Sequence, residues 1–227
     1  QRVSLWQNPA GAVLSPGTAR IAVQAAIAPD GSSIVFVDSA GSGSGLWIKR
    51  REASDPTAIA GTENAISPFF SPDGAWIGYF TTDGMLKKVP VTGGGSITLA
   101  RDVAETSFSG TWLDDGTIVF ADESEGLLRI SGDGGPAAIV IPDSVLARRA
   151  IMMLSPLPDS RGVLYAWCEG NCMMGSSVSV FGFARDSSRV LVRDAAGAWH
   201  SPTGHLLYTD RTGGLYAAAF DLGRLAT

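Results

Sequence analysis

Short apolar runs alternate with polar, glycine-rich turns along the whole chain. A turn of the type apolar/Ser-Pro-Asp-Gly ends on Gly31, Gly74, Gly116, Gly162 and Gly204, so the spacings are 43, 42, 46 and 42 residues. In this turn, proline presets φ, aspartate accepts local backbone hydrogen bonds, and glycine takes the position that needs positive φ. The five copies, at residues 28–31, 71–74, 113–116, 157–162 and 201–204, predict a five-fold internal repeat.

Each of the first four repeats predicts four strands, and the fifth predicts three. The strand after each turn is a continuous apolar run, which indicates burial on both faces. It carries one aromatic side chain that we expect to anchor the core of its unit: Phe36, Tyr79, Phe120, Tyr165 and Tyr208. Two more strands follow, and a first strand precedes the turn. Four strands in about 42 residues is the rhythm of a β-propeller blade.

The pattern predicts an all-β protein, a β-propeller of about five four-stranded blades. The blade units are expected at about residues 25–61, 66–100, 108–141, 151–193 and 197–227. The last unit lacks a fourth strand, and residues 19–23 form a spare one, so this N-terminal strand is expected to close the ring and to remove two exposed sheet edges. A single domain then spans 18–227 behind a tail or linker at 1–17. The alternative is a fragment of a six-bladed or larger propeller.

Net charge and hydropathy limit the classes of partner that we expect. With 17 Lys and Arg against 22 Asp and Glu, the net charge is −5, so we expect no nucleic-acid partner. No apolar run approaches the roughly 20 residues that span a bilayer. We therefore expect that this segment does not insert into a membrane and that it is soluble. The expected partner is a protein, a peptide or a small ligand.

The repeat motifs resemble those of TolB-like bacterial propellers, in which a Ser-Pro-Asp-Gly turn precedes an Ile-Ala-Phe-like strand. Residues 67–80 and 86–89, with 202–208, most resemble the propeller ectodomains C-terminal to some bacterial serine/threonine protein kinases. The likeness covers about residues 25–220 and rests on turns and core strands. The chain has no His-Arg-Asp or Asp-Phe-Gly segment, so we expect it to carry no kinase activity of its own.

The resemblance implies a non-catalytic scaffold, periplasmic or extracellular, that acts as the sensor region of a bacterial kinase-like protein. One alternative is the propeller domain of a prolyl-oligopeptidase-like hydrolase. Another is a propeller enzyme, such as a lyase or a glycosidase, that uses its central channel. Paired channel carboxylates or a channel metal would favour the channel enzyme.

The candidate binding residues lie in the connections on one face of the predicted propeller. This rim carries the fourth-to-first and second-to-third strand connections, which are the longer and more irregular ones, and loops of this kind carry function on repeat scaffolds. Mixed charge beside Met and Trp suits protein or peptide contacts. The candidates are Glu63, Arg101, Glu105, Arg148, Arg149 and Glu169. A solvated rim without a ligand is the alternative.

Other chemistry-bearing residues favour structural roles. Asp30, Asp73, Asp115 and Asp159 recur once per blade but sit in turns, where a carboxylate satisfies backbone N–H groups. A Ser-His-Asp set from Ser201, His200 or His205, and Asp210 lacks a Gly-x-Ser-x-Gly turn. We therefore expect no catalytic residue, metal or cofactor.

The two cysteines of the chain, Cys168 and Cys172, enclose a Gly-Asn turn. A hairpin there would place them within reach of a disulfide. The alternatives are two free thiols or, less favoured with so few histidines, a metal site.

Overall fold

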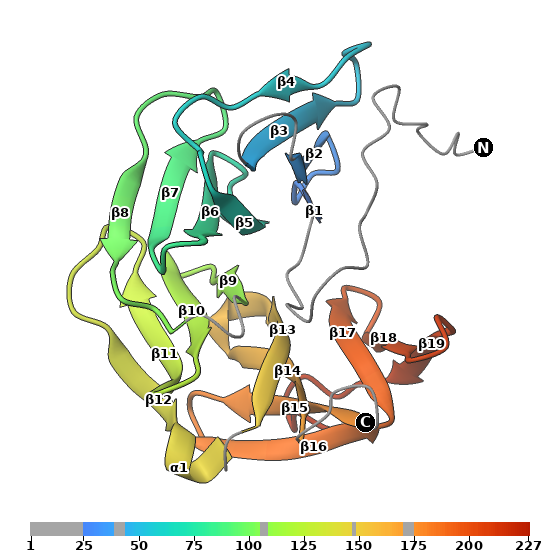
Figure 1. Ribbon diagram of the computed structural model, residues 1–227. Coiled ribbons are helices and arrows are strands. Elements are labelled where there is room, and N and C mark those ends of the chain that lie inside the picture. The colour runs from blue at the N-terminus through green and yellow to red at the C-terminus, as the bar shows by residue number, and fades with distance from the viewer. Residues whose placement is uncertain (1–24, 39–43, 105–108, 147–148, 170–174) are drawn as a thin grey trace.

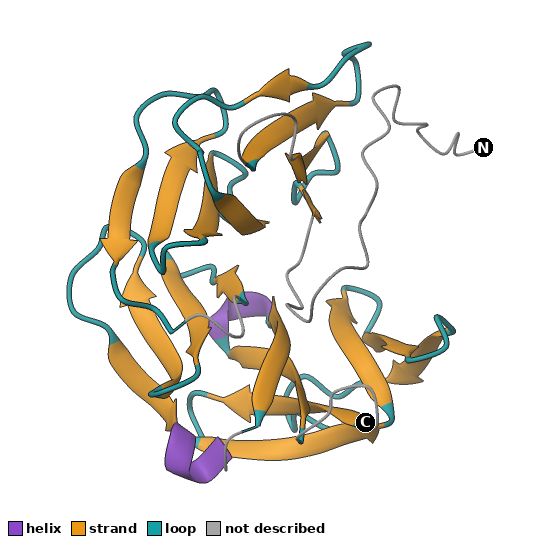
Figure 2. Ribbon diagram, in the orientation of Figure 1, coloured by secondary structure: helices purple, strands orange, loops and turns teal. Residues whose placement is uncertain are grey.

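The computed structural model describes residues 25–38, 44–104, 109–146, 149–169 and 175–227. These residues form five antiparallel sheets, with one short α-helix, α1 (Asp143–Leu146), and a 3₁₀ turn, η1 (Pro158–Ser160). Figure 2 shows that strands and turns make up nearly all of the fold. None of the helices in the described ranges is long and apolar enough to cross a bilayer.

The sheets follow the sequence repeat, and each is one blade. Blade 1 contains β1 (Ala25–Ile27), β2 (Ser33–Asp38), β3 (Gly45–Arg50) and β4 (Thr57–Ala58). Blade 2 contains β5 (Ala65–Phe70), β6 (Trp76–Thr81), β7 (Leu86–Pro90) and β8 (Ile97–Ala100). Blade 3 contains β9 (Gly110–Trp112), β10 (Thr117–Asp122), β11 (Gly126–Ser131) and β12 (Ala138–Pro142).

The last two blades differ in strand number. Blade 4 contains β13 (Ala150–Pro156), β14 (Gly162–Cys168), β15 (Ser176–Gly182) and β16 (Ser187–Arg193). Blade 5 has three described strands, β17 (Ala195–Ser201), β18 (His205–Asp210) and β19 (Leu215–Ala219). The predicted five-bladed β-propeller is confirmed. The closing strand at 19–23 and the tail at 1–17 lie outside the described residues.

The blades are arranged around a common centre (Figure 1). The first strand of each blade is the innermost, and neighbouring first strands contact one another in the order β1, β5, β9, β13, β17. The fourth strands β4, β8, β12 and β16 lie on the perimeter. Within the described part of the chain, β17 makes no extensive contact with β1, so the arc is open between blade 5 and blade 1.

Four apolar cores hold the arc together, one between each pair of consecutive blades. Between blades 2 and 3, for example, Phe69 and Phe80 pack against Trp112 and Phe120. The other three cores join blades 1 and 2, 3 and 4, and 4 and 5. A strand in the middle of the series is therefore covered on both faces, as for β6 and β10.

We expected the second strand of every blade to be buried on both faces, and this expectation is wrong for the two terminal blades. In β2 and β18, buried positions are interspersed with exposed or half-buried ones. Each has a neighbouring blade on one side only. As a result, Tyr79, Phe120 and Tyr165 are buried as anchors, whereas Phe36 and Tyr208 are half-buried.

A basic side chain on or just after the third strand of each of blades 1 to 4 reaches across to the next blade. Each contacts the segment that follows the third strand of that blade. Arg50 Nη2 donates to Val91 O at 3.3 Å, and Arg185 donates to Arg224 O at 2.8 Å and to Gly223 O at 3.0 Å. Lys88 Nζ lies 3.3 Å from Asp133 Oδ1, and the Arg129 guanidinium lies 4.5 Å from the centre of the Phe183 ring. These contacts add a polar link to each apolar core.

Lys88 offers the sharpest test of these links, because its side chain is buried and its ammonium also lies 4.5 Å from the centre of the Trp76 ring. We expect Lys88→Ala to lower the free energy of unfolding by about 1–2 kcal/mol, through lost packing of the stem and a lost cation–π contact. The adjacent Lys87→Ala is the control, with an expected change within about 0.5 kcal/mol. Urea unfolding measures both, and equal losses would contradict the link.

Candidate functional site

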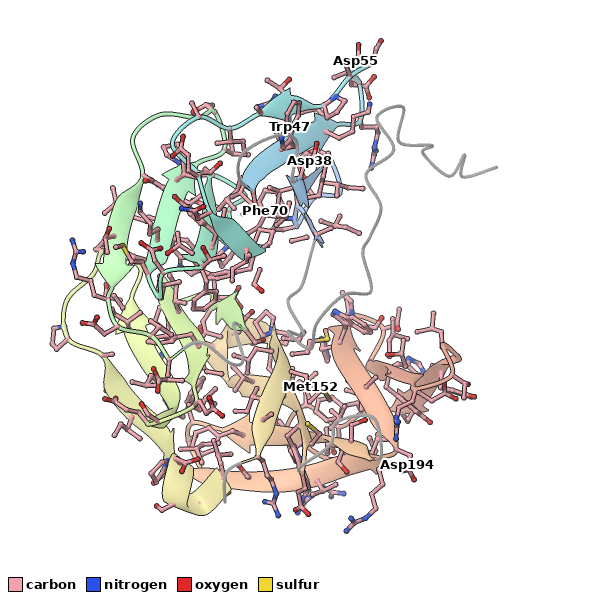
Figure 3. All side chains as sticks on the ribbon, in the orientation of Figure 1. Asp38, Trp47, Asp55, Phe70, Met152 and Asp194 are labelled. Atoms are coloured by element: carbon pink, nitrogen blue, oxygen red, sulfur yellow. The ribbon has the colours of Figure 1, made fainter. Side chains whose placement is uncertain are left out.

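A cavity of about 800 Å³ lies at the centre of the arc. It is lined by the first strands of all five blades and by residues of the Pro-Asp-Gly turns that follow them. Figure 3 labels Phe70 of β5, which lines this cavity, and Met152 of β13, the strand across the centre from it. The cavity is therefore the one feature that every blade helps to build.

The cavity lining is mainly apolar. Ile27, Pro68, Phe69, Trp112, Met153 and Trp199 supply side chains of several shapes. Hydroxyl groups come from Ser67, Ser109, Thr111 and Ser155. Asp114 is the only ionisable residue among the described lining residues, and its Oδ2 already accepts the Asp159 N–H at 2.7 Å. Such a lining can hold an uncharged, partly apolar ligand and orient it with a few hydrogen bonds.

Ser67 is the most unusual residue of the lining. It lies at a β-bulge between Ile66 and Phe69 of β5, and its φ of 49° is in the left-handed region, which serine rarely adopts. Its side chain is 2% exposed, and Ser67 Oγ has no hydrogen-bond partner among the described residues. A buried hydroxyl without a partner costs about 1–3 kcal/mol, and strained backbone tends to cluster at ligand sites. Ser67 therefore combines a strained backbone with an unsatisfied buried hydroxyl in the described lining of the cavity.

Two glycines position Phe69 beside this bulge. A Cβ on Gly78 would lie 2.4 Å from the Phe69 ring, and a Cβ on Gly110 would lie 2.7 Å from it. Gly78 belongs to blade 2 and Gly110 to blade 3, so the ring occupies a slot between the two blades. Phe69 thus joins the cavity wall to the core between blades 2 and 3.

Trp199 closes the opposite wall, on β17, and its side chain is 41% exposed. The sequence analysis did not select it. A signal was present, since Trp199 stands two residues ahead of the fifth turn, at the place that Phe69 of the cavity lining holds ahead of the second turn.

The four rim candidates that the structure describes are Glu63, Arg101, Arg149 and Glu169, and only Arg149 and Glu169 have a recorded contact with each other. Arg149 and Glu169 do meet, with Nη2 and Oε1 2.8 Å apart, and the Arg149 guanidinium lies 4.2 Å from the centre of the Trp167 ring. Trp167 Nε1 in turn donates to Ser179 Oγ at 2.8 Å. This cluster ties the connection between blades 3 and 4 to the hairpin of blade 4.

Glu63 and Arg101 lie in two other connections between blades. Glu63 is exposed, near Tyr79, whose pKa is raised mainly by burial and to a lesser extent by the Glu63 charge. Arg101 Nη1 contacts Met85 Sδ at 4.0 Å. Glu105 and Arg148 lie outside the described residues. None of the four described candidates lines the central cavity.

Asp122 is a buried carboxylate on the same rim that the sequence analysis missed. Burial alone would raise the pKa of Asp122, but hydrogen bonds from the backbone N–H of Ala104 and from Ser124 and Glu125 outweigh it and hold the pKa below its ordinary value. Because Ala104 belongs to the connection between blades 2 and 3, this carboxylate joins that connection to the hairpin of blade 3.

The turn aspartates act within their own turns. Asp30, Asp73 and Asp115 each accept a backbone N–H two residues ahead, at 2.9–3.0 Å. Asp159 differs, because it adopts a positive φ of 57° and lies 3.5 Å from Arg161 Nε. Across the described ranges, no group of three or more His, Cys, Asp or Glu residues has the geometry of a metal site.

The Ser-His-Asp set does not assemble. Ser201 Oγ and His205 Nδ1 both contact Thr203 Oγ1, at 2.8 and 3.1 Å. Asp210 lies at the other end of β18, where hydrogen bonds from Thr212, Gly214 and Tyr216 lower its pKa to about 2.

The proposed disulfide stays a prediction. Cys168 is buried at the end of β14, and Cys172 lies outside the described residues.

No protein-family model matches the sequence, and a search of curated proteins gave no match. Solved structures do match. The putative TolB from Agrobacterium tumefaciens is 14% identical, with a TM-score of 0.65 over 88% of this chain and 75% of that one. TolB from Acinetobacter baumannii is 13% identical, with a TM-score of 0.69 over 87% of this chain and 51% of that one.

A third match is a chain of a nidogen/laminin complex. It is 15% identical, with a TM-score of 0.66 over 91% of this chain and 78% of that one. At such low identities the likeness concerns the fold. The chain therefore has the β-propeller architecture of its TolB structural neighbours.

Proposed function

We propose that the protein is a non-catalytic binding propeller that holds an extended, largely apolar peptide segment of a partner protein in its central cavity. The observation that carries this proposal is the 800 Å³ cavity, in which a buried Ser67 hydroxyl lacks a partner among the described residues. A peptide backbone supplies hydrogen-bonding groups for Ser67, and apolar side chains would pack against Trp112 and Trp199. That one propeller of similar fold is found in a nidogen/laminin complex also supports a protein partner.

A channel enzyme is less well supported. Glycosidase chemistry in the channel would need paired carboxylates. The described lining offers one carboxylate, Asp114, whose Oδ2 already accepts a backbone N–H.

We further propose that the domain works outside the cytoplasm as the sensor region of a kinase-like protein. The sequence resemblance to kinase-linked ectodomains and the predicted Cys168–Cys172 disulfide support this assignment. Disulfides persist in oxidising compartments.

Selected peptides can test the binding site. Peptides from a phage-displayed random library, enriched on the immobilised protein, would be titrated by calorimetry into the wild type and its variants. We expect Trp199→Ala to weaken binding about tenfold or more, since exposed aromatic anchors dominate such interfaces. Ile139→Ala is the matched control, an exposed apolar residue on the perimeter strand β12 that should leave affinity unchanged. Loss of binding in Arg149→Ala with full binding in Trp199→Ala would place the site on the rim instead.

Variants of two serines can distinguish an effect on peptide binding from an effect on stability. Ser67 and Ser176 are the described residues whose buried side-chain hydroxyls lack a partner, and only Ser67 lines the cavity. Removing such a hydroxyl relieves its desolvation cost, so neither Ser67→Ala nor Ser176→Ala should lower the melting temperature. Only Ser67→Ala should weaken peptide binding. Equal affinities of the two variants would remove Ser67 from the site.

A further inference from the structure

One end of the central cavity is acidic. Each turn of the repeat follows the innermost strand of its blade, so the turns gather at one end of the cavity, where Pro29, Pro72 and Asp114 line it. The five turns together contain five aspartates and a single arginine. These are Asp30, Asp73, Asp114, Asp115 and Asp159, against Arg161. A ligand that reaches this end therefore meets a surplus of negative charge.

Asp114 is the acidic residue best placed to contact a ligand, because it is the one aspartate of these turns that lines the cavity. Its neighbours already have basic partners, since Asp115 pairs with Arg129 and Asp159 lies 3.5 Å from Arg161 Nε. Asp114 has no ion pair within the described chain. The Asp159 N–H fixes its carboxylate through Oδ2 at 2.7 Å, and Oδ1 accepts no hydrogen bond from the described residues.

The cavity itself offers Asp114 no counter-charge, since no lysine or arginine is among its described lining residues. The same lining contains a second polar group without a partner, the Ser67 hydroxyl, on a residue that is 2% exposed. A ligand that satisfies both groups has to donate a hydrogen bond or a positive charge to Asp114 and to form a hydrogen bond with Ser67 Oγ.

Strand geometry gives the spacing between the two groups. Asp114 is the second residue of its turn, as Pro72 is of the turn that follows β5. Ser67 lies five residues ahead of Pro72, and the bulge of β5 takes up one of them. About four residues of extended strand, or roughly 13 Å, therefore separate Ser67 from the level of Asp114. An extended peptide advances by the same rise per residue.

We propose that the peptide held in the central cavity carries an arginine or lysine about four residues from the residue that hydrogen-bonds Ser67 Oγ, and that Asp114 binds this basic side chain. The inference rests on the proposed function, because it specifies which peptides the cavity takes. The apolar part of the peptide lies against Trp112 and Trp199, and the basic residue lies at the acidic end. Complementary charge of this kind determines specificity and orientation at an interface.

Peptide selection on two proteins tests the preference. Phage-displayed random peptides would be enriched in parallel on the wild type and on Asp114→Asn, whose amide oxygen can still accept the Asp159 N–H, so its melting temperature should be unchanged. Peptides selected on the wild type should share an arginine or lysine at one position, and those selected on Asp114→Asn should not.

A double-mutant cycle isolates the contact. In calorimetry with a synthetic selected peptide, replacing its basic residue by glutamine should weaken binding to the wild type roughly three- to tenfold and leave binding to Asp114→Asn unchanged. Asp55→Asn is the matched control. Asp55 is an exposed aspartate of the connection between β3 and β4, labelled in Figure 3, and is not among the cavity-lining residues. It should keep the preference of the wild type, and equal losses of preference in Asp55→Asn and Asp114→Asn would overturn the contact.

Two further outcomes distinguish this inference from the proposed function. Selected peptides that lose affinity in Trp199→Ala but show no preference for a basic residue would overturn the role of Asp114 and leave the cavity as the binding site. Peptides that bind Trp199→Ala and Asp114→Asn as tightly as the wild type would overturn both.

Discussion

Replacing Phe120 with alanine should lower the free energy of unfolding by about 3–5 kcal/mol, the usual cost of deleting a buried phenylalanine ring. Phe120 is 2% exposed in the core between blades 2 and 3, and its ring centre lies 6.4 Å from that of Phe80. The cavity left behind would touch two blades, neither of which can collapse into it without shifting the other. Urea unfolding followed by circular dichroism gives the value.

Tyr208 is the matched control at the same position of blade 5. It is half-buried and stacks on Tyr216, with ring centres 5.4 Å apart, on the face already covered by blade 4. We expect Tyr208→Ala to cost less than about 2 kcal/mol, since less surface is removed from water there. Equal losses at the two positions would contradict the graded burial from the middle of the arc to its ends.

Gly126→Ala should lower the free energy of unfolding by about 3 kcal/mol or more. Gly126 has a φ of +110°, and an added Cβ would lie 2.2 Å from Ile141 O and 2.7 Å from Asp143 N. Both are backbone atoms of the neighbouring strand β12 and helix α1, so no side-chain rotation relieves the clash. Backbone strain and overpacking each contribute about 1–3 kcal/mol.

Two other glycines separate these causes. Gly116 has a φ of +81° with no atom within 4 Å of an added Cβ, so Gly116→Ala should show the backbone strain alone, about 1 kcal/mol. Gly95 has neither a left-handed φ nor a close neighbour, and Gly95→Ala should leave stability nearly unchanged. If Gly126→Ala and Gly116→Ala lower the free energy of unfolding by the same amount, then the close approach of β12 is not the reason that position 126 requires glycine.

The repeat was predictable because its signals are local. Proline, aspartate and glycine determine each turn within four residues, and the hydrogen bonds of Asp30, Asp73 and Asp115 show this chemistry at work. Where the glycine of the motif is displaced, the structure departs as well. Asp159, followed by Ser160 instead of glycine, takes a positive φ, and its carboxylate lies 3.5 Å from Arg161 Nε.

The packing between blades was not predictable from the same signals. The continuous apolar run at 34–37 resembles the one at 118–120, yet Val119 and Phe120 are both buried, while Ile34 is exposed and Phe36 half-buried. The difference depends on whether a blade lies on each side, which no local pattern records.

The candidate site also depends on contacts between residues that are far apart in the sequence. The longest connections pointed to the rim, where Arg149 and Glu169 prove to pair with each other. The cavity arises only when five first strands meet, and the bulge that holds Ser67 depends on pairing between β5 and β6.

A crystal structure of the protein with the tightest-binding selected peptide tests the central claim most directly. The account predicts a peptide in the central cavity, in contact with Trp112 and Trp199 and hydrogen-bonded to Ser67 Oγ. A peptide bound on the rim beside Arg149 and Glu169, with the cavity empty of it, would contradict the account.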